Sequence, residues 1–438
     1  MWSQAISFEK GHLTISGLSA RELATQFGTP TFFIDEDHFR DRARAWAHSL
    51  EQHFGQSAGD VYYAAKAFIC TDVARWIKEE GIGIDVCTGG ELAVALAGGI
   101  DPKKIEVHGN NKSVAEIERA VQVGVKTIVI DSLFEIDRVA AAASKHGARQ
   151  GVMLRLTPGV EAHTHESIST AHEDVKFGFS IASGAAAIAV AEVLSHASLE
   201  LRGFHCHVGS QIFGTDSFEL AATRIIALMK ACKEKHGIEL PELDLGGGYA
   251  IAYVPGEATV EPEDVLPSLS AVVKRECAAA GLALPIISIE PGRNIVGPTT
   301  FTLYEVGTVK DVLLEDGSTR RYISVDGGMS DNIRPSLYGA EYSAVLADRV
   351  STSAHVLSRV VGKHCETGDI VIRDIQLPSD IAPGDLLATP ATGAYGRSMA
   401  SNYNHLPRPP VVAIKNGKAR VIVRRENEAD LLALDVKE

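Results

Sequence analysis

Between residues 36 and 300 the sequence alternates short β-rich runs with longer segments of helical periodicity. Eight β-rich runs lie at residues 61–67, 82–88, 104–109, 126–132, 151–157, 201–208, 240–245 and 285–290. Alternating β and α elements indicate a parallel sheet, because each helical crossover lets the next strand run in the same direction. Eight repeats predict a (β/α)8 barrel, with a doubly wound open sheet as the alternative.

Three of the intervening segments have the clearest helical pattern. They are GGELAVALAGG at 89–99, KSVAEIERAVQVG at 112–124 and FELAATRIIALMKACKEKHG at 218–237. Apolar residues recur there at intervals of three and four, which places them on one face of a helix. These segments predict helices that cover the sheet.

After Arg293 the pattern changes to Val-, Ile- and Thr-rich runs separated by DGS, PGD and NGK turns. This is typical of antiparallel β structure. We therefore expect an all-β domain of sandwich or Greek-key type at residues 301–438, after a barrel domain at 36–300. The segment 1–35 contains two β-like runs around a helix, and we expect it to pack with the β domain.

The composition argues against several classes of partner. The formal net charge is -14 and the acidic residues are spread along the chain, which disfavours nucleic acid and anionic membranes. No apolar run is long enough to span a bilayer, and residues 1–10 lack a secretion signal, so we expect a cytoplasmic protein. The six cysteines show no CxxC spacing, which argues against a zinc site and a disulfide framework.

Two features at predicted strand ends indicate chemistry. Lys66 stands in the apolar run VYYAAKAF, where a charge is unfavourable and a Schiff base to an aldehyde would remove it. Gly246, Gly247 and Gly248 follow the seventh run, where barrels often bind phosphate through backbone N–H groups. An exposed lysine and a tight turn are the alternatives to these two readings.

Further polar residues follow the sixth and eighth runs. Glu290 and Arg293 lie in ISIEPGR, where a carboxylate could hold a pyridine nitrogen protonated and a guanidinium could bind a carboxylate. His207 and Ser210 lie in FHCHVGSQIF, where an imidazole could stack on a ring and a hydroxyl could donate to phosphate. Together these residues predict a site at one end of the barrel.

The ordered motifs YAAKA, HVGSQ, LGGGY, EPGR, DGGMSDNIRPSLYGAEY, GKHCETGD and ATGAYG resemble the fold type III pyridoxal-phosphate-dependent decarboxylases. The resemblance runs from about residue 20 to the C-terminus. It implies an alanine-racemase-like barrel joined to a β domain that includes the N-terminal segment. It also implies pyridoxal 5′-phosphate as cofactor and a head-to-tail homodimer with active sites at the interface.

Carried over by residue, the resemblance implies two catalytic residues: Lys66, which forms the Schiff base, and Cys365, a proton donor from the neighbouring subunit. The implied cofactor-binding residues are Lys66, His207, Ser210, Gly246, Gly247, Gly248, Glu290, Pro291, Gly292, Arg293 and Tyr395. The implied substrate-binding residues are Arg293, Arg334, Tyr338, Glu366 and Tyr395. Asp85, His108 and Arg155 also fall at strand ends and could support the cofactor. Gly396 and Arg397 replace an aromatic residue usual in the family, which puts the outer pocket wall in question.

The implied reaction is decarboxylation of a basic or dicarboxylic amino acid. Arg334 for a distal carboxylate and Glu366 for a distal amine favour meso-diaminopimelate over ornithine, arginine or carboxynorspermidine. The product would then be L-lysine, in the last step of its biosynthesis. An amino-acid racemase would need two bases, and a non-catalytic pyridoxal-phosphate-binding protein would resemble the barrel alone.

A metal-dependent barrel hydrolase is the remaining alternative. The run EAHTHESISTAHED at 161–174 holds three histidines and four carboxylates, but at irregular spacing. Metal sites need clustered ligands. We interpret the run as a loop on the substrate side and expect no metal.

Overall fold

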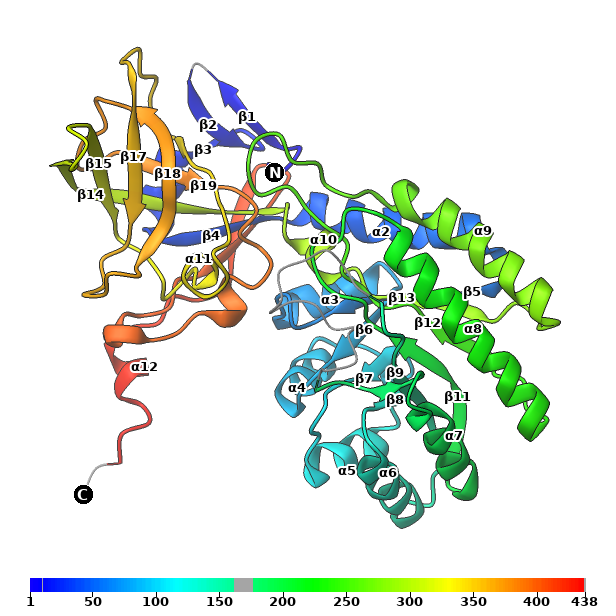
Figure 1. Ribbon diagram of the computed structural model, residues 1–438. Helices are drawn as coiled ribbons and strands as arrows, with labels where there is room; N and C mark the ends of the chain where they lie inside the picture. Colours follow the sequence, from blue (N-terminus) through cyan, green and yellow to red (C-terminus); the bar gives the residue numbers. More distant parts are fainter. Residues whose placement is uncertain (10, 161–175, 437–438) are drawn as a thin grey trace. The chain divides into compact units, whose positions relative to one another are not determined.

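The structure, a computed structural model, describes residues 1–9, 11–160 and 176–436. The chain divides into two compact units (Figure 1). The barrel unit comprises Arg42–Ala250 and Thr259–Asn294, and the β unit comprises Met1–Asp41, Ile251–Ala258 and Ile295–Glu438. The domain limits expected from the sequence, at 35/36 and 300/301, stay a prediction.

The barrel unit is built on a closed ring of parallel strands. They are β5 (Ala58–Ala64), β6 (Gly83–Val86), β7 (Ile105–Val107), β8 (Thr127–Ile130), β9 (Gln150–Thr157), β11 (Leu199–Cys206), β12 (Glu242–Asp244) and β13 (Ile286–Ile289). Each pairs with the next, and β13 pairs with β5 to close the ring. The short strand β10 (Phe179–Ser180) is a further neighbour of β9. The barrel prediction is confirmed, and the open-sheet alternative is wrong.

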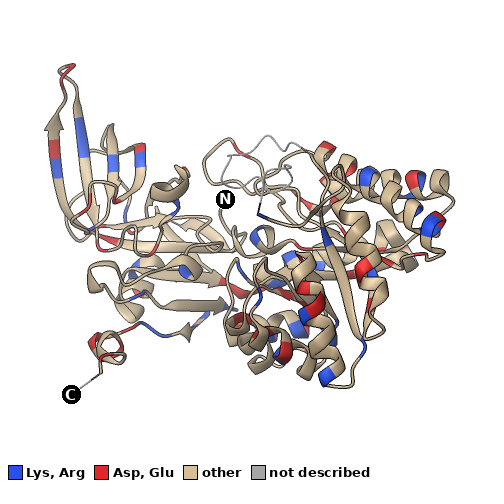
Figure 2. Cartoon of the chain, turned by 60° about the horizontal axis from the view of Figure 1, so that its bottom comes forward, with Lys and Arg blue, Asp and Glu red and all other residues tan. Residues whose placement is uncertain are grey.

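Helices connect the strands and surround the ring (Figure 1). They are α2 (Glu36–Phe54), α3 (Thr71–Glu79), α4 (Gly89–Ala97), α5 (Val114–Val123), α6 (Leu133–Lys145), α7 (Ala185–Ser195), α8 (Asp216–His236) and α9 (Pro262–Ala280). The three helices expected from periodicity are α4, α5 and α8. Residues of both charges are interspersed on several of these helices, as on solvated faces (Figure 2). Within the described ranges, no helix is long and apolar enough to cross a membrane.

Helix α5 shows why such segments begin and end where they do. The Ser113 side chain accepts a hydrogen bond from the Glu116 N–H, and the Glu116 carboxylate accepts one from the Ser113 N–H. This reciprocal cap satisfies two donors that the first turn leaves free. Gly124, in the left-handed conformation, ends the helix. Between the two caps, Ile117 and its neighbours bury the apolar face against the barrel.

A buried asparagine links three segments of the barrel unit. Asn294 Oδ1 accepts hydrogen bonds from Trp46 Nε1 at 2.8 Å and from Arg42 Nη2 at 2.5 Å. Its Nδ2 donates to the Val260 and Ala250 carbonyl oxygens at 2.7 and 3.1 Å. Both ends of the amide are thus used in the interior, where unsatisfied polar groups are costly.

The β unit contains two sheets. A three-stranded sheet holds β1 (Ile6–Glu9), β2 (His12–Ile15) and β3 (Leu18–Ser19). A larger sheet has the order β18-β17-β15-β14-β4-β20-β21, with β19 pairing both β14 and β16. Its strands are β4 (Thr31–Asp35), β14 (Thr300–Leu313), β15 (Thr319–Val325), β16 (Val345–Leu346), β17 (His355–Val361), β18 (Ile370–Pro378), β19 (Leu386–Thr389), β20 (Val411–Lys415) and β21 (Lys418–Val423). Its short helices are α1 (Ala20–Phe27), α11 (Arg334–Tyr338) and α12 (Glu428–Leu432). Helix α10 (Gly292–Val296) begins in the barrel unit and ends in the β unit.

Strand β4 joins the N-terminal segment to this larger sheet. It runs antiparallel to β14 and parallel to β20, and all five of its residues are buried. The Phe33 ring stacks on the Phe301 ring with centroids 5.3 Å apart. The core around these rings combines residues from β2, β14 and β20. The N-terminal strands are therefore an integral part of the β unit.

We predict that Asn294→Ala destabilises the barrel unit by about 2–5 kcal/mol, since each buried polar group left without a partner costs about 1–3 kcal/mol. Denaturant unfolding of the protein without cofactor measures this. Asn111→Ala, which removes an exposed side chain of the same unit, is the control and should change stability by less than about 0.5 kcal/mol. Equal stability of the two variants would contradict a structural role for the network.

Candidate active site

The carboxyl ends of the barrel strands carry most of the predicted cofactor residues. His207 directly follows β11, Glu290 directly follows β13, and Gly246 lies two residues after β12. Lys66 was expected within the first strand but lies two residues beyond the end of β5, in a turn. Because parallel strands of a closed ring end on one rim, the structure brings these residues together.

Lys66 is half-buried and lies among titratable groups of that rim. Burial and then the Glu290 charge raise the pKa of Asp85 well above its ordinary value, and the Lys66 charge opposes them. Burial and then the Lys66 charge lower the pKa of His207 well below its ordinary value. The amine therefore lies within electrostatic reach of a carboxyl, a carboxylate and an imidazole.

Glu290 lies between two buried imidazoles. Its Oε1 is 3.2 Å from His108 Nε2 and 3.1 Å from His205 Nε2, and the two rings meet edge to face at 4.8 Å. Burial acts to raise the pKa of Glu290, but the imidazoles and Lys66 outweigh it and hold the pKa well below the ordinary value. Burial lowers the pKa of both histidines. The surroundings therefore favour an ionised Glu290, whereas burial disfavours a charge on either ring.

The glycine triplet packs against the loops on either side of it. Gly246 N donates to Asp244 Oδ1 at 2.6 Å, and Gly247 N donates to His207 Nδ1 at 3.4 Å. A Cβ on Gly247 would overlap the Glu290 carbonyl oxygen, so only glycine fits there. Close packing thus explains why glycine is needed at part of the triplet. The triplet also joins the loop after β11 to the loop after β13.

Ser210 and Arg293 meet at the same rim. Arg293 is 8% exposed, and its Nη2 donates to Ser210 Oγ at 2.8 Å. A hydroxyl and a guanidinium in contact form a pair that suits an oxyanion such as phosphate or carboxylate. The sequence placed these two residues at separate strand ends, and the structure brings them into contact.

In the β unit, Arg334 lies on α11 in an aromatic environment. Its Nη1 donates to the Tyr342 hydroxyl at 2.5 Å, and its guanidinium lies 4.5 Å from the Tyr253 ring centroid. The residue is 6% exposed, and no carboxylate pairs with it in the described part of the chain. Tyr395, whose φ is +60°, lies close enough to raise the pKa of the same guanidinium electrostatically. Tyr338, one turn further along α11, is half-buried.

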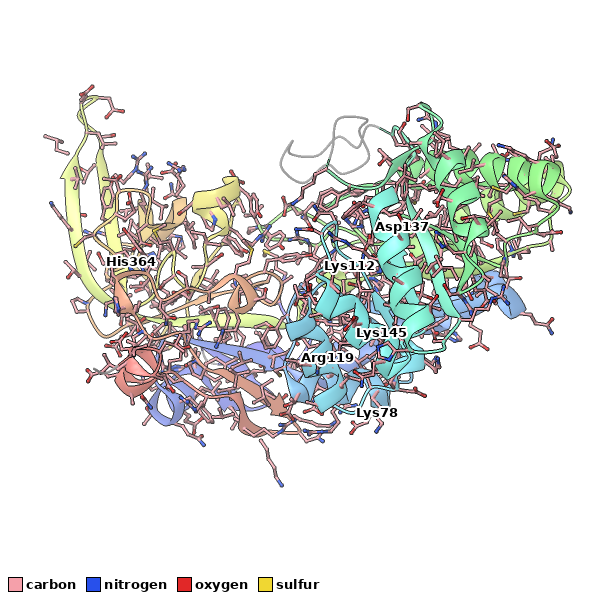
Figure 3. The ribbon with its side chains drawn as sticks, turned by 90° about the horizontal axis from the view of Figure 1, so that it is seen from below. Lys78, Lys112, Arg119, Asp137, Lys145 and His364 are labelled. Atoms are coloured by element: carbon pink, nitrogen blue, oxygen red, sulfur yellow. The ribbon has the colours of Figure 1, made fainter. Side chains whose placement is uncertain are left out.

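The loop that carries Cys365 and Glu366 is exposed but anchored, in part through His364, which is labelled in Figure 3. Buried Asp369 accepts hydrogen bonds from Met329 N at 2.6 Å and from His364 N at 2.8 Å. His364 Nε2 contacts Ser330 Oγ at 2.8 Å and its Nδ1 contacts Asn404 Oδ1 at 3.0 Å. Ser336 of α11 also donates to the Gly368 carbonyl at 2.6 Å. The loop is thereby tied to the helix that carries Arg334.

Lys112 is a buried lysine with a different environment from Lys66 (Figure 3). Its Nζ donates to the Gly109 and Val129 carbonyl oxygens at 2.7 and 2.6 Å and to Glu135 Oε1 at 2.7 Å. An ammonium has three donors, and all three are used here. Lys112 therefore joins the segments after β7 and β8 and has no donor left for a ligand.

Several residues of the site were not predicted from the sequence. They are His205, Glu106, Asp244, Asp369 and Tyr342. The available signal was a polar residue inside an otherwise apolar strand, as in IEV and LDL. The run 161–174, considered as a metal site, lies outside the described residues. Gly396, which departs from the family pattern, packs on the Thr392 carbonyl, where a Cβ would lie 2.5 Å from the oxygen.

Comparison with known proteins agrees with this geometry. Residues 36–297 match the family described as pyridoxal-dependent decarboxylase, pyridoxal binding domain. The chain is 53% identical over 433 residues to diaminopimelate decarboxylase of Mycobacterium tuberculosis (98% of this chain, 96% of that protein) and 47% identical over 432 residues to that of Corynebacterium efficiens (99% and 93%).

The fold also matches solved structures. A diaminopimelate decarboxylase from M. jannaschii in co-complex with L-lysine superimposes with a TM-score of 0.91 at 29% identity, covering 100% of this chain and 99% of that one. The family match, the sequence identity over nearly the full length and the structural match agree with one another. They confirm the resemblance inferred from the sequence. The chain belongs to the pyridoxal-dependent decarboxylases, among the diaminopimelate decarboxylases.

Proposed function

We propose that this chain removes CO2 from meso-2,6-diaminopimelate and releases L-lysine, the last step of lysine biosynthesis, with pyridoxal 5′-phosphate as cofactor. Relatives that match it over nearly their full length are named diaminopimelate decarboxylase, and one related structure contains L-lysine. The observation that supports meso-diaminopimelate as the substrate is the environment of Arg334. It is a buried cation for which the described residues supply no anion.

The barrel rim fits the cofactor by the chemistry of its donors. Lys66 offers an amine to the aldehyde, and Ser210 with Arg293 offers a hydroxyl and a guanidinium to the phosphate. Glu290 is a buried anion beside neutral imidazoles, which suits a protonated ring nitrogen. When bound, pyridoxal phosphate acts as an electron sink for the electron pair that departing CO2 leaves behind.

The other cofactor contacts are assigned by position on the same rim. His207 would lie against the ring face, because it directly follows β11 beside Lys66. Backbone N–H groups near Ser210 would bind phosphate. The residues proposed for the phosphate end on this rim are Gly246, Gly247, Gly248, Pro291 and Gly292. Tyr395, which belongs to the β unit, is proposed as a cofactor contact from the family resemblance alone.

Substrate selection is assigned to the β unit. The rings of Tyr253 and Tyr342 hold the Arg334 guanidinium, so a bidentate bond to a distal carboxylate requires little reorganisation. The exposed Glu366 carboxylate would bind the distal amine, with Tyr338 beside the substrate. Ornithine has no second carboxylate and would leave Arg334 unpaired. Leaving this buried cation unpaired is unfavourable, so the site discriminates against ornithine.

We assign the proton that replaces CO2 to Cys365 and propose a homodimer with shared active sites. The thiol is exposed on an anchored loop of the β unit, where it can be presented to another subunit. Asp369 and His364 fix the loop without covering the thiol. The cytoplasmic location expected from the sequence stays a prediction.

We predict that Lys66→Ala abolishes covalent capture of the cofactor, because the variant lacks the amine that bonds to the cofactor aldehyde. Borohydride reduction followed by intact mass measurement should add one cofactor per chain to the wild type and none to the variant. Lys78→Ala on α3, which removes an exposed lysine of the same unit, should still be labelled. Labelling of Lys66→Ala would identify a different anchoring lysine.

For Arg334→Ala we expect kcat/KM for meso-diaminopimelate to fall more than tenfold. A hydrogen bond to a charged group contributes about 1.5–3 kcal/mol, and each 1.4 kcal/mol is a factor of ten. CO2 release at low substrate concentration measures this. Arg373→Ala, an exposed arginine of β18, is the matched control and should leave kcat/KM unchanged. An unaffected Arg334→Ala would place the distal carboxylate elsewhere.

The shared site predicts complementation between inactive variants. Lys66→Ala and Cys365→Ala should each be inactive as homodimers, whereas a mixed dimer contains one site with both residues intact. Random reassociation makes roughly half of the dimers mixed, so up to about a quarter of wild-type activity should return. If subunit exchange is demonstrated and no activity returns, Cys365 does not serve the partner's barrel.

A further inference from the structure

Two further carboxyl groups lie in the barrel interior next to Glu290. Glu106 belongs to β7 and Asp244 to β12, and both are fully buried. Oxygen atoms of Glu106, Asp244 and Glu290 all lie within 4.8 Å of one another. β7 and β12 are not neighbours in the ring, so these side chains meet across its interior.

Glu106 and Asp244 have few hydrogen-bond donors. Among the described residues, three of their four carboxylate oxygens (both of Glu106 and Oδ2 of Asp244) accept no hydrogen bond in good geometry, although the nearby Tyr62 hydroxyl acts to lower the pKa of Glu106. Asp244 Oδ1 is used by Gly246 N. The titratable or charged groups that act on the pair are Tyr62 on β5, Asp85 on β6, His108 at 3.8 Å from Glu106, Lys126 before β8, Cys206 on β11, Glu242 on β12, and Tyr249 and Glu290 beyond the strands.

Three ionised carboxylates this close would repel one another strongly in a dry interior. Burial, followed by the charges of Glu290 and Glu242, raises the pKa of Glu106 to about 8, although Lys126 opposes the shift. Burial, Glu290 and Glu106 raise the pKa of Asp244 well above its ordinary value. The directions of these shifts favour a single charge on Glu290, beside the imidazoles, with protons on the other two groups.

We propose that Glu106 and Asp244 are positioning residues that act as neutral carboxylic acids. Their O–H groups donate within the cluster and keep the single negative charge on Glu290, where, on the proposed function, it faces the ring nitrogen of the cofactor. Asp244 also holds the N–H of Gly246, so one side chain orients both the carboxylate and the glycine turn.

The first test uses the protein without cofactor and therefore does not depend on the proposed function. A carboxyl whose pKa is 4.5 when unfolded and about 8 when folded binds more protons in the folded state between these values. The free energy of unfolding then falls as pH rises through that window. Glu106→Gln removes this contribution, so its Tm relative to the wild type should rise by a few degrees from pH 5 to pH 8.5.

Glu51→Gln, which changes an exposed carboxylate of α2, is the matched control and should show a constant Tm difference. A constant difference for Glu106→Gln would overturn the proposal, because it would mean that Glu106 is ionised in the folded protein. A cation held by three carboxylates would produce that result as well.

The second test measures binding of pyridoxal phosphate and the pH dependence of its absorbance. Glutamine keeps a donor and the size of a protonated carboxyl, so Glu106→Gln should bind within about twofold of the wild type. Glu106→Leu removes the donor and should bind at least tenfold more weakly, with a shifted pH profile. Equal losses in the two variants would show that the charge of Glu106 is needed, and this would overturn the proposal. Absence of decarboxylase activity in the wild type would refute the function and leave the result of the first test standing.

Discussion

The pairing of β13 with β5 closes the barrel, and the candidate site depends on that closure. Ile287 pairs with Ala58 and Ile289 with Val61, which brings the last strand of the ring beside the first. Glu290 and Lys66 follow these two strands and come close for that reason, although more than 200 residues separate them in the sequence. The same closure brings β7 opposite β12. An open sheet would separate the carboxyls that meet in the interior.

Buried charged side chains have three kinds of environment in this structure. Lys112 has three oxygen acceptors from its own unit, which completes its hydrogen bonds. Glu290 is surrounded by imidazoles that can donate to it but remain neutral. Arg334 has aromatic rings and a hydroxyl, which orient its guanidinium without neutralising it. A charge that the chain itself satisfies is structural, and a charge left without a counter-ion indicates where a ligand of opposite sign binds.

The barrel could be predicted because buried parallel strands are short apolar runs at regular intervals, and the eight runs overlap the eight observed strands. Lys66, Glu290 and the glycine triplet could be found because they lie at or just after the ends of such runs. His205 and Glu106 could not, since whether a polar residue inside a strand faces the interior depends on the strand's register and on closure. Asp369 was missed for a related reason. Its two backbone donors, Met329 and His364, come from separate segments that only the fold brings together.

The position of β4 in the sheet has a consequence for the order of events during synthesis. β4 is synthesised before its neighbours β14 and β20, which emerge about 270 and 380 residues later. The whole barrel leaves the ribosome first, and chains lengthen by only about 5–20 residues per second. Until then Thr31–Asp35 lacks both of its partner strands, and an apolar segment with unpaired edges is prone to pair with other chains.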